Sequence, residues 1–89
     1  MKAVVTVTGK DSVGIIAKVS VACAEQGANI LDIAQSVLSD YFAMMMLVDV
    51  DGLKIPFGDF VDYMRELGTQ NHLRIDTMHE DIFNSMHRI

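Results

Sequence analysis

The patterns along the 89 residues of the chain follow the order strand, helix, strand, strand, helix, strand, and this order leaves few possible folds. The strand patterns are rich in β-branched and apolar residues and cover residues 2–8, 29–38, 41–50 and 72–78. The helix patterns, in which apolar residues recur every three or four positions, cover residues 13–26 and 56–67. The order predicts an α+β fold of the ferredoxin-like βαββαβ type. This fold is a sandwich of a four-stranded antiparallel sheet with two helices on one of its faces.

The ends of the predicted helices carry residues that favour starting or stopping a helix. Asp11 or Ser12 can cap the first helix, and Gly27 provides the left-handed residue after it. Pro56 suits the first position of the second helix, and Gly68 is expected to end that helix. Right-handed crossovers would put the first and third strands in the centre of the sheet, so the second and fourth strands are expected at its edges.

The third predicted strand is apolar on both faces. One face carries Phe42, Met44, Met46, Val48 and Val50, and the other carries Ala43, Met45 and Leu47. One face can pack on the helices, but the second needs a cover or a partner. The second strand, at the edge, also mixes apolar residues on both sides, which invites self-pairing. We therefore expect a homodimer or a higher homo-oligomer.

Length and composition restrict the class of protein. The chain is expected to form one domain over residues 1–89, with a core that ends at about residue 79 and a short C-terminal helix within 80–89. It is 51% hydrophobic with a formal charge of -5, and it lacks a cluster of Lys and Arg. Nucleic acid is therefore not expected as a direct partner. No apolar run is long enough to cross a bilayer, so neither a leader nor a membrane partner is expected, and the expected location is cytoplasmic.

Two short motifs flank the first helix pattern. The stretch D-S-V-G ends at Gly14, and E-Q-G-A-N-I-L-D-I covers residues 25–33. Together with the order of elements as far as Met78, they resemble the ACT domain, a small regulatory module that senses amino acids. The short chain is similar to stand-alone ACT proteins related to the N-terminal half of the glycine cleavage system transcriptional repressor. Many members carry proline where this chain has Val13.

The resemblance implies a ligand site made of Asp11, Ser12, Val13, Gly14, Asn29 and Ile30. Elementary chemistry gives several of these residues a role. The free N–H groups at a helix N-terminus suit a carboxylate, and Gly14 leaves room for a ligand. Asp11 can pair with an ammonium group, and Asn29 supplies both a donor and an acceptor.

In the family, the Asn-Ile strand of one chain commonly meets the turn of a second chain. The resemblance therefore implies a non-catalytic regulatory module that binds a small amino acid at a subunit interface. It also implies a regulated protein partner, and no cofactor.

Four of these six residues also have a purely structural explanation. Asp11 and Ser12 can act as helix caps alone. Gly14 can be required for packing of the helix on the sheet, and Asn29 can be present because it tolerates an unusual backbone angle.

Other chemistry is not favoured by the remaining reactive residues. His72, His79 and His87, with Glu80 and Asp81 near the second, match no standard zinc spacing, so no metal site is expected. The run Met44–Met46 alternates between two strand faces and is expected to pack in the core and at an interface rather than bind copper. Cys23 lies on the apolar stripe of the first helix and is expected to be buried and inert.

Three other functions remain as alternatives. The first is an oligomerisation or protein-interaction module without a ligand. The second is an acylphosphatase-like enzyme, which needs a cationic phosphate cradle where this chain offers only Lys10. The third is an RNA-binding domain, which needs exposed aromatic residues on the two central strands, and the first strand has none.

Overall fold

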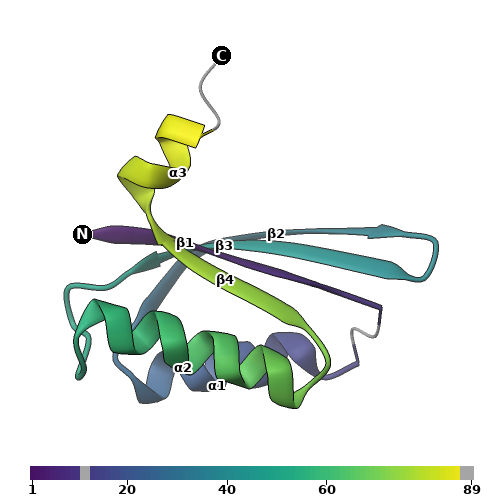
Figure 1. Cartoon of the computed structure of the whole chain (residues 1–89), viewed down its shortest axis with the longest axis horizontal. Helices are drawn as coiled ribbons and strands as arrows, with labels where there is room; N and C mark the ends of the chain where they lie inside the picture. The colour runs from purple at the N-terminus through teal and green to yellow at the C-terminus, as the bar shows by residue number, and fades with distance from the viewer. Residues whose placement is uncertain (11–12, 87–89) are drawn as a thin grey trace.

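The computed structural model describes residues 1–10 and 13–86, and it confirms the predicted ferredoxin-like order of elements (Figure 1). The elements are β1 (Lys2–Gly9), α1 (Ile15–Glu25), β2 (Asn29–Leu38), β3 (Tyr41–Asp49), α2 (Phe57–Gln70), β4 (Arg74–His79) and α3 (Glu80–Met86).

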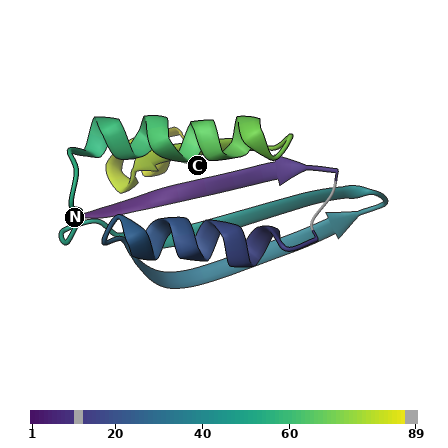
Figure 2. The same ribbon diagram turned by 90° about the horizontal axis from the view of Figure 1, so that it is seen from below.

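The sheet has the strand order β2-β3-β1-β4, and every neighbouring pair is antiparallel. The predicted central strands β1 and β3 and the predicted edge strands β2 and β4 are thus confirmed. Residues of β1 pair with β3 from Lys2 opposite Asp49 to Gly9 opposite Phe42. The β2–β3 hairpin and the end of β1 therefore lie at the same end of the sheet (Figure 2).

The hydrophobic core lies between the sheet and the two long helices, which cover the same face (Figure 2). Its largest fully buried side chains are Phe60, Met44, Met46, Met64 and Ile75. The predicted inner face of β3 is confirmed, because its residues are buried whereas Met45 on the opposite face is 42% exposed. The sheet therefore has one packed face and one face that α3 covers in part.

Helix α1 packs through most of the apolar stripe that its sequence predicts. Ile15, Val19, Ala22 and Cys23 are buried, whereas Ile16, which belongs to the same predicted stripe, is 38% exposed. The helix is followed by Gly27 at φ 84°, as expected for a left-handed residue after a helix. A Cβ at that position would overlap the carbonyl oxygen of Gly52, so the site excludes larger residues for two reasons.

The predicted boundaries of the second helix need correction. Pro56 is the N-cap rather than the first residue of α2, and the helix continues past Gly68 to Gln70. Gly68 is a buried residue of the last turn, where a Cβ would lie 2.8 Å from the carbonyl oxygen of Leu73. It is therefore needed for close packing of α2 on β4. The C-cap of the helix is Asn71, whose side-chain amide donates to the carbonyl of Leu67 at 2.8 Å.

The start of the last strand is also later than expected. His72 lies in the turn between α2 and β4 with φ 58°, so β4 begins at Arg74 rather than at residue 72. Leu73 packs against the core from this turn, and Ile75 is fully buried as predicted.

The C-terminal helix α3 contacts β1 and β4. The apolar residues Ile82, Phe83 and Met86 of this helix are not covered equally, because Phe83 is partly buried whereas Ile82 and Met86 are 55% and 66% exposed. None of the helices in the described ranges is long and apolar enough to cross a membrane.

Candidate functional site

The turn between β1 and α1 contains four of the six residues expected to bind a ligand. Asp11 and Ser12 lie outside the described residues, so their roles as caps or ligand contacts stay predictions. Val13 is 86% exposed. Gly14 is the N-cap of α1, with φ 71° and ψ 1°, and its carbonyl accepts the first helical hydrogen bond from the N–H of Lys18 at 3.1 Å.

Gly14 is required by its backbone conformation and not by packing. Its φ lies in the left-handed region, which non-glycine residues adopt at a cost of about 1–2 kcal/mol. A Cβ built at this position meets no atom of the described residues within 4 Å. The explanation that Gly14 allows the helix to pack on the sheet is therefore wrong, and no described residue fills the space next to Gly14.

The N-terminus of α1 carries no charge that would neutralise its dipole within the described residues. The first turn of the helix contains no acidic residue, and no described side chain caps it with a hydrogen bond. The free N–H groups of a first helical turn behave as a partial positive charge of about +0.5. This end of α1 thus suits an anionic group.

Asn29 and Ile30 lie at the end of the sheet opposite to the turn that contains Gly14. Asn29 pairs with Asp49, and Asp49 also pairs with Lys2 at the start of β1. The turn follows Gly9, which is seven residues further along β1, or about 23 Å at the rise of an extended strand. Within one chain, the structure therefore does not bring the two halves of the predicted site together.

Neither of these β2 residues has a positive φ. Asn29 is exposed and has no positive φ, so the explanation that it tolerates such an angle is wrong. Ile30 is partly buried and packs against the core. Asn29 thus begins β2 with a polar side chain that faces solvent.

A cation, Lys10, lies beside the turn, and the sequence suggested it only as an insufficient phosphate cradle. The ammonium of Lys10 is 5.5 Å from the centre of the Tyr41 ring, within reach of a cation–π interaction. A hollow of about 390 Å³ opens next to this pair, between Thr8 and the exposed side chains of Leu38 and Tyr41. The register of β1 on β3 creates this arrangement, and the local sequence gives no signal for it.

The other reactive groups offer little chemistry. Cys23 is fully buried, and burial raises the pKa of its thiol to about 11, so it is not a nucleophile at neutral pH. His72 precedes β4 and His79 ends it, while His87 lies outside the described residues. Nδ1 of His79 accepts the N–H of Asp81 at 3.0 Å. The described part of the chain contains no group of three His, Cys, Asp or Glu side chains arranged to hold a metal.

Comparisons with known proteins agree with this architecture. A family model described as the ACT domain matches residues 2–70. The UPF0237 protein CPE1496 of Clostridium perfringens is 46% identical over 89 residues, which cover 100% of both chains. The structure of an ACT domain protein from Streptococcus pneumoniae superposes with a TM-score of 0.82 at 42% identity and covers 93% of each chain.

A further solved structure is that of a putative glycine cleavage system transcriptional repressor. It matches with a TM-score of 0.69 at 25% identity, over 89% of this chain and 47% of that protein. The likeness therefore concerns about half of that longer chain.

Proposed function

The chain belongs to the ACT domain family, and from this premise we propose that it is a non-catalytic regulatory module that binds a small amino acid between two subunits. The observation that carries the proposal is the conformation of Gly14, which holds a left-handed backbone beside open space at the N-terminus of α1. That geometry leaves the first N–H groups of the helix accessible to a ligand carboxylate. Asp11 would pair with the ligand ammonium, and Lys10 adds a cation near the carboxylate.

The second half of the site would come from a second copy of the chain. Strand β2 is an edge strand, and every residue from Leu31 to Leu38 is exposed. Two β2 strands that pair symmetrically in antiparallel orientation bring Asn29 of one copy opposite Leu38 of the other. Leu38 lies at the end of the sheet that carries the turn. Such a homodimer would therefore join the two half-sites that lie far apart in one chain.

A regulated protein partner and a cytoplasmic location complete the proposal. One of the similar solved proteins is a putative transcriptional repressor, and a repressor acts where the genome is. Binding of an amino acid at a subunit boundary can change the dimer surface that such a partner meets, provided that the ligand prefers one arrangement of the two chains.

A second candidate is a pure oligomerisation module. The exposed edge of β2 supports it equally well, because edge pairing requires no ligand. The two candidates differ only in whether a free amino acid binds.

A thermal-shift screen of the twenty amino acids tests the proposal. A ligand at ten times its Kd adds about 1.4 kcal/mol to stability and raises the Tm of a domain of this size by about 6–11 °C. If no amino acid shifts the Tm, the oligomerisation module becomes the better conclusion.

Three variants then locate the site. Gly14→Ala and Gly14→Leu share the backbone strain at φ 71°, but only leucine is large enough to fill the open space. We expect Gly14→Leu to lose the ligand-induced shift and Gly14→Ala to keep most of it. Gly58→Leu is the matched control, because Gly58 is also exposed with nothing within 4 Å of a Cβ. Equal ligand shifts in both leucine variants would contradict a site at this turn.

A further inference from the structure

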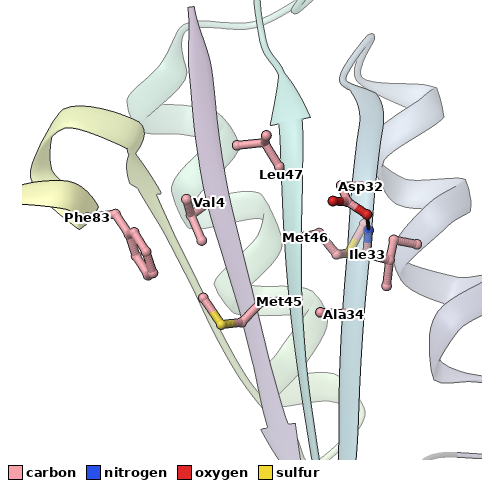
Figure 3. Close-up of a pocket in the computed structure, with 8 residues that line it drawn as sticks. All are labelled: Val4, Asp32, Ile33, Ala34, Met45, Met46, Leu47 and Phe83. Carbon is pink, nitrogen blue, oxygen red and sulfur yellow. Dashed lines mark hydrogen bonds between the residues drawn. The ribbon is translucent and has the colours of Figure 1, made fainter. Parts of the chain in front are cut away.

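A second hollow lies on the opposite face of the sheet from α1 and α2. Figure 3 shows its floor, formed by Val4 of β1 with Met45 and Leu47 of β3, and its wall, formed by Phe83 of α3. Ala34 and Asp32 of β2 line the side away from α3. The hollow measures about 200 Å³, the size of a small organic molecule.

The floor of this hollow is apolar and only partly covered. Val4 is 7% exposed because it lies next to α3, whereas Met45 remains 42% exposed. Among the three apolar side chains of α3, Phe83 alone is partly buried. Phe83 is the apolar residue of α3 that lines the hollow, and apolar surface remains beside its ring.

A β-bulge turns one charged residue toward the hollow. The pairing of β2 with β3 shifts between Ile30, which pairs with Val48, and Asp32, which pairs with Leu47. Strict alternation would have paired Leu31 with Leu47 and turned Asp32 toward the helix-covered face. Because the bulge adds one residue, Asp32 shares the outer face with Leu47 instead.

Among residues 1–10 and 13–86, Asp32 is the only charged residue that lines the hollow. Its Oδ1 accepts the N–H of Ile33 at 2.9 Å, and it forms no ion pair within the described ranges. The hollow therefore offers an apolar floor, an aromatic wall and a single carboxylate. None of the lining residues in the described part of the chain is a cation that would favour a carboxylate ligand.

We propose that this hollow is a second ligand site, which binds a small amine with an apolar body and no carboxylate. The ammonium pairs with Asp32, and the body lies across Met45 and Leu47 toward Phe83. The span from β2 to β1 is two strand spacings, about 9.6 Å. An aryl-alkyl amine with a two-carbon linker bridges this distance. Its ring adds contacts to Phe83, so its binding holds α3 against the sheet.

Three probes of one skeleton test the charge preference by calorimetry on the full chain. These are 2-phenylethylamine, neutral 2-phenylethanol and anionic 3-phenylpropanoate. We expect the amine to bind about two- to five-fold more tightly than the alcohol, the gain of an exposed ion pair, and the carboxylate to bind most weakly. Equal affinity of the amine and the carboxylate would overturn the assignment.

Variants of the carboxylate and the ring provide the second arm. Asp32→Asn should reduce the amine to the affinity of the alcohol, while Asp40→Asn, an exposed change in the hairpin loop, should not. Phe83→Ala should weaken all three probes by about ten-fold or more, since it removes one wall, whereas Met86→Ala on the exposed side of α3 should have no effect. An unchanged Kd in Asp32→Asn would refute the role of the carboxylate.

Hydrogen exchange and sedimentation distinguish this amine site from the amino-acid site at the turn and from a subunit interface. The amine should slow amide exchange within 80–86, and the amino-acid response of the turn should persist in Asp32→Asn, so the two sites fail independently. If the parent dimer binds no amine and Phe83→Ala converts it to a monomer, the hollow belongs to a subunit interface and the ligand assignment is wrong.

Discussion

Two glycines of α2 provide a matched test of the packing between this helix and the sheet. Gly68 is buried, and a Cβ there would lie 2.8 Å from the Leu73 carbonyl oxygen and 3.1 Å from the Ile75 nitrogen. Both neighbours are backbone atoms, one just before β4 and one within it, so they cannot rotate away. Gly58 lies in the first turn of the same helix, is exposed, and has nothing within 4 Å of its Cβ position.

The two alanine variants should change stability in opposite directions. Gly58→Ala should stabilise the protein by about 0.5–1 kcal/mol, because alanine favours the helix and restricts the unfolded chain. Gly68→Ala gains part of the same stabilisation from the helix preference of alanine, because it lies near the helix end. Its methyl group must also push β4 away from α2, at a cost of about 1–3 kcal/mol. We expect a net loss of about 1–2 kcal/mol, so the two variants should differ by about 2 kcal/mol.

Urea denaturation at one fixed protein concentration measures this difference, because a dimer makes the apparent stability depend on concentration. In thermal scans the same difference corresponds to about 8–16 °C in Tm for a domain of this size. If Gly68→Ala proves as stable as Gly58→Ala, the close approach of α2 to β4 is wrong, and Gly68 is simply a helix end as its sequence context predicts.

Three further predictions concern the dimer, the buried thiol and the shared site. Sedimentation should show a dimer of the 9.8 kDa chain. The substitution Val37→Lys on the exposed edge strand should shift the dimer toward monomer while the circular dichroism spectrum of the fold is kept. A monomeric parent protein would contradict the dimer. Burial raises the pKa of the Cys23 thiol to about 11 in the folded protein, from about 9 in the unfolded chain. The stability that the buried neutral thiol contributes should therefore be fully present below pH 9 and should decline as pH rises toward 11. The variant Cys23→Ala should lack this decline. A mixed dimer with Asp11→Ala in one subunit and Asn29→Ala in the other should titrate as one intact ligand site and one doubly damaged site. Each change should cost about 1–3 kcal/mol in ligand affinity. Two equally weakened sites would exclude a site shared between subunits.

The sequence motifs identified both segments of the candidate site but not the distance between them. The flanking motifs identified both the turn at Gly14 and the start of β2 at Asn29, because each lies beside a helix end with its own local signal. Their separation within one chain does not follow from those signals. It depends on which end of β1 each segment meets, and that is decided by strand pairing between residues about 40 positions apart.

Local sequence was sufficient where one short-range effect dominates. The order of elements follows from hydrophobic periodicity, the inner face of β3 follows from strict alternation, and Gly27 follows from the steric demand of a left-handed residue. Tertiary contacts decided the rest. Gly68 reads as a helix stop, yet it lies inside α2 because β4 approaches too closely for a side chain. Asp32 faces the outer hollow because a bulge against β3 shifts its register by one residue, and such a shift depends on the partner strand as well as on β2.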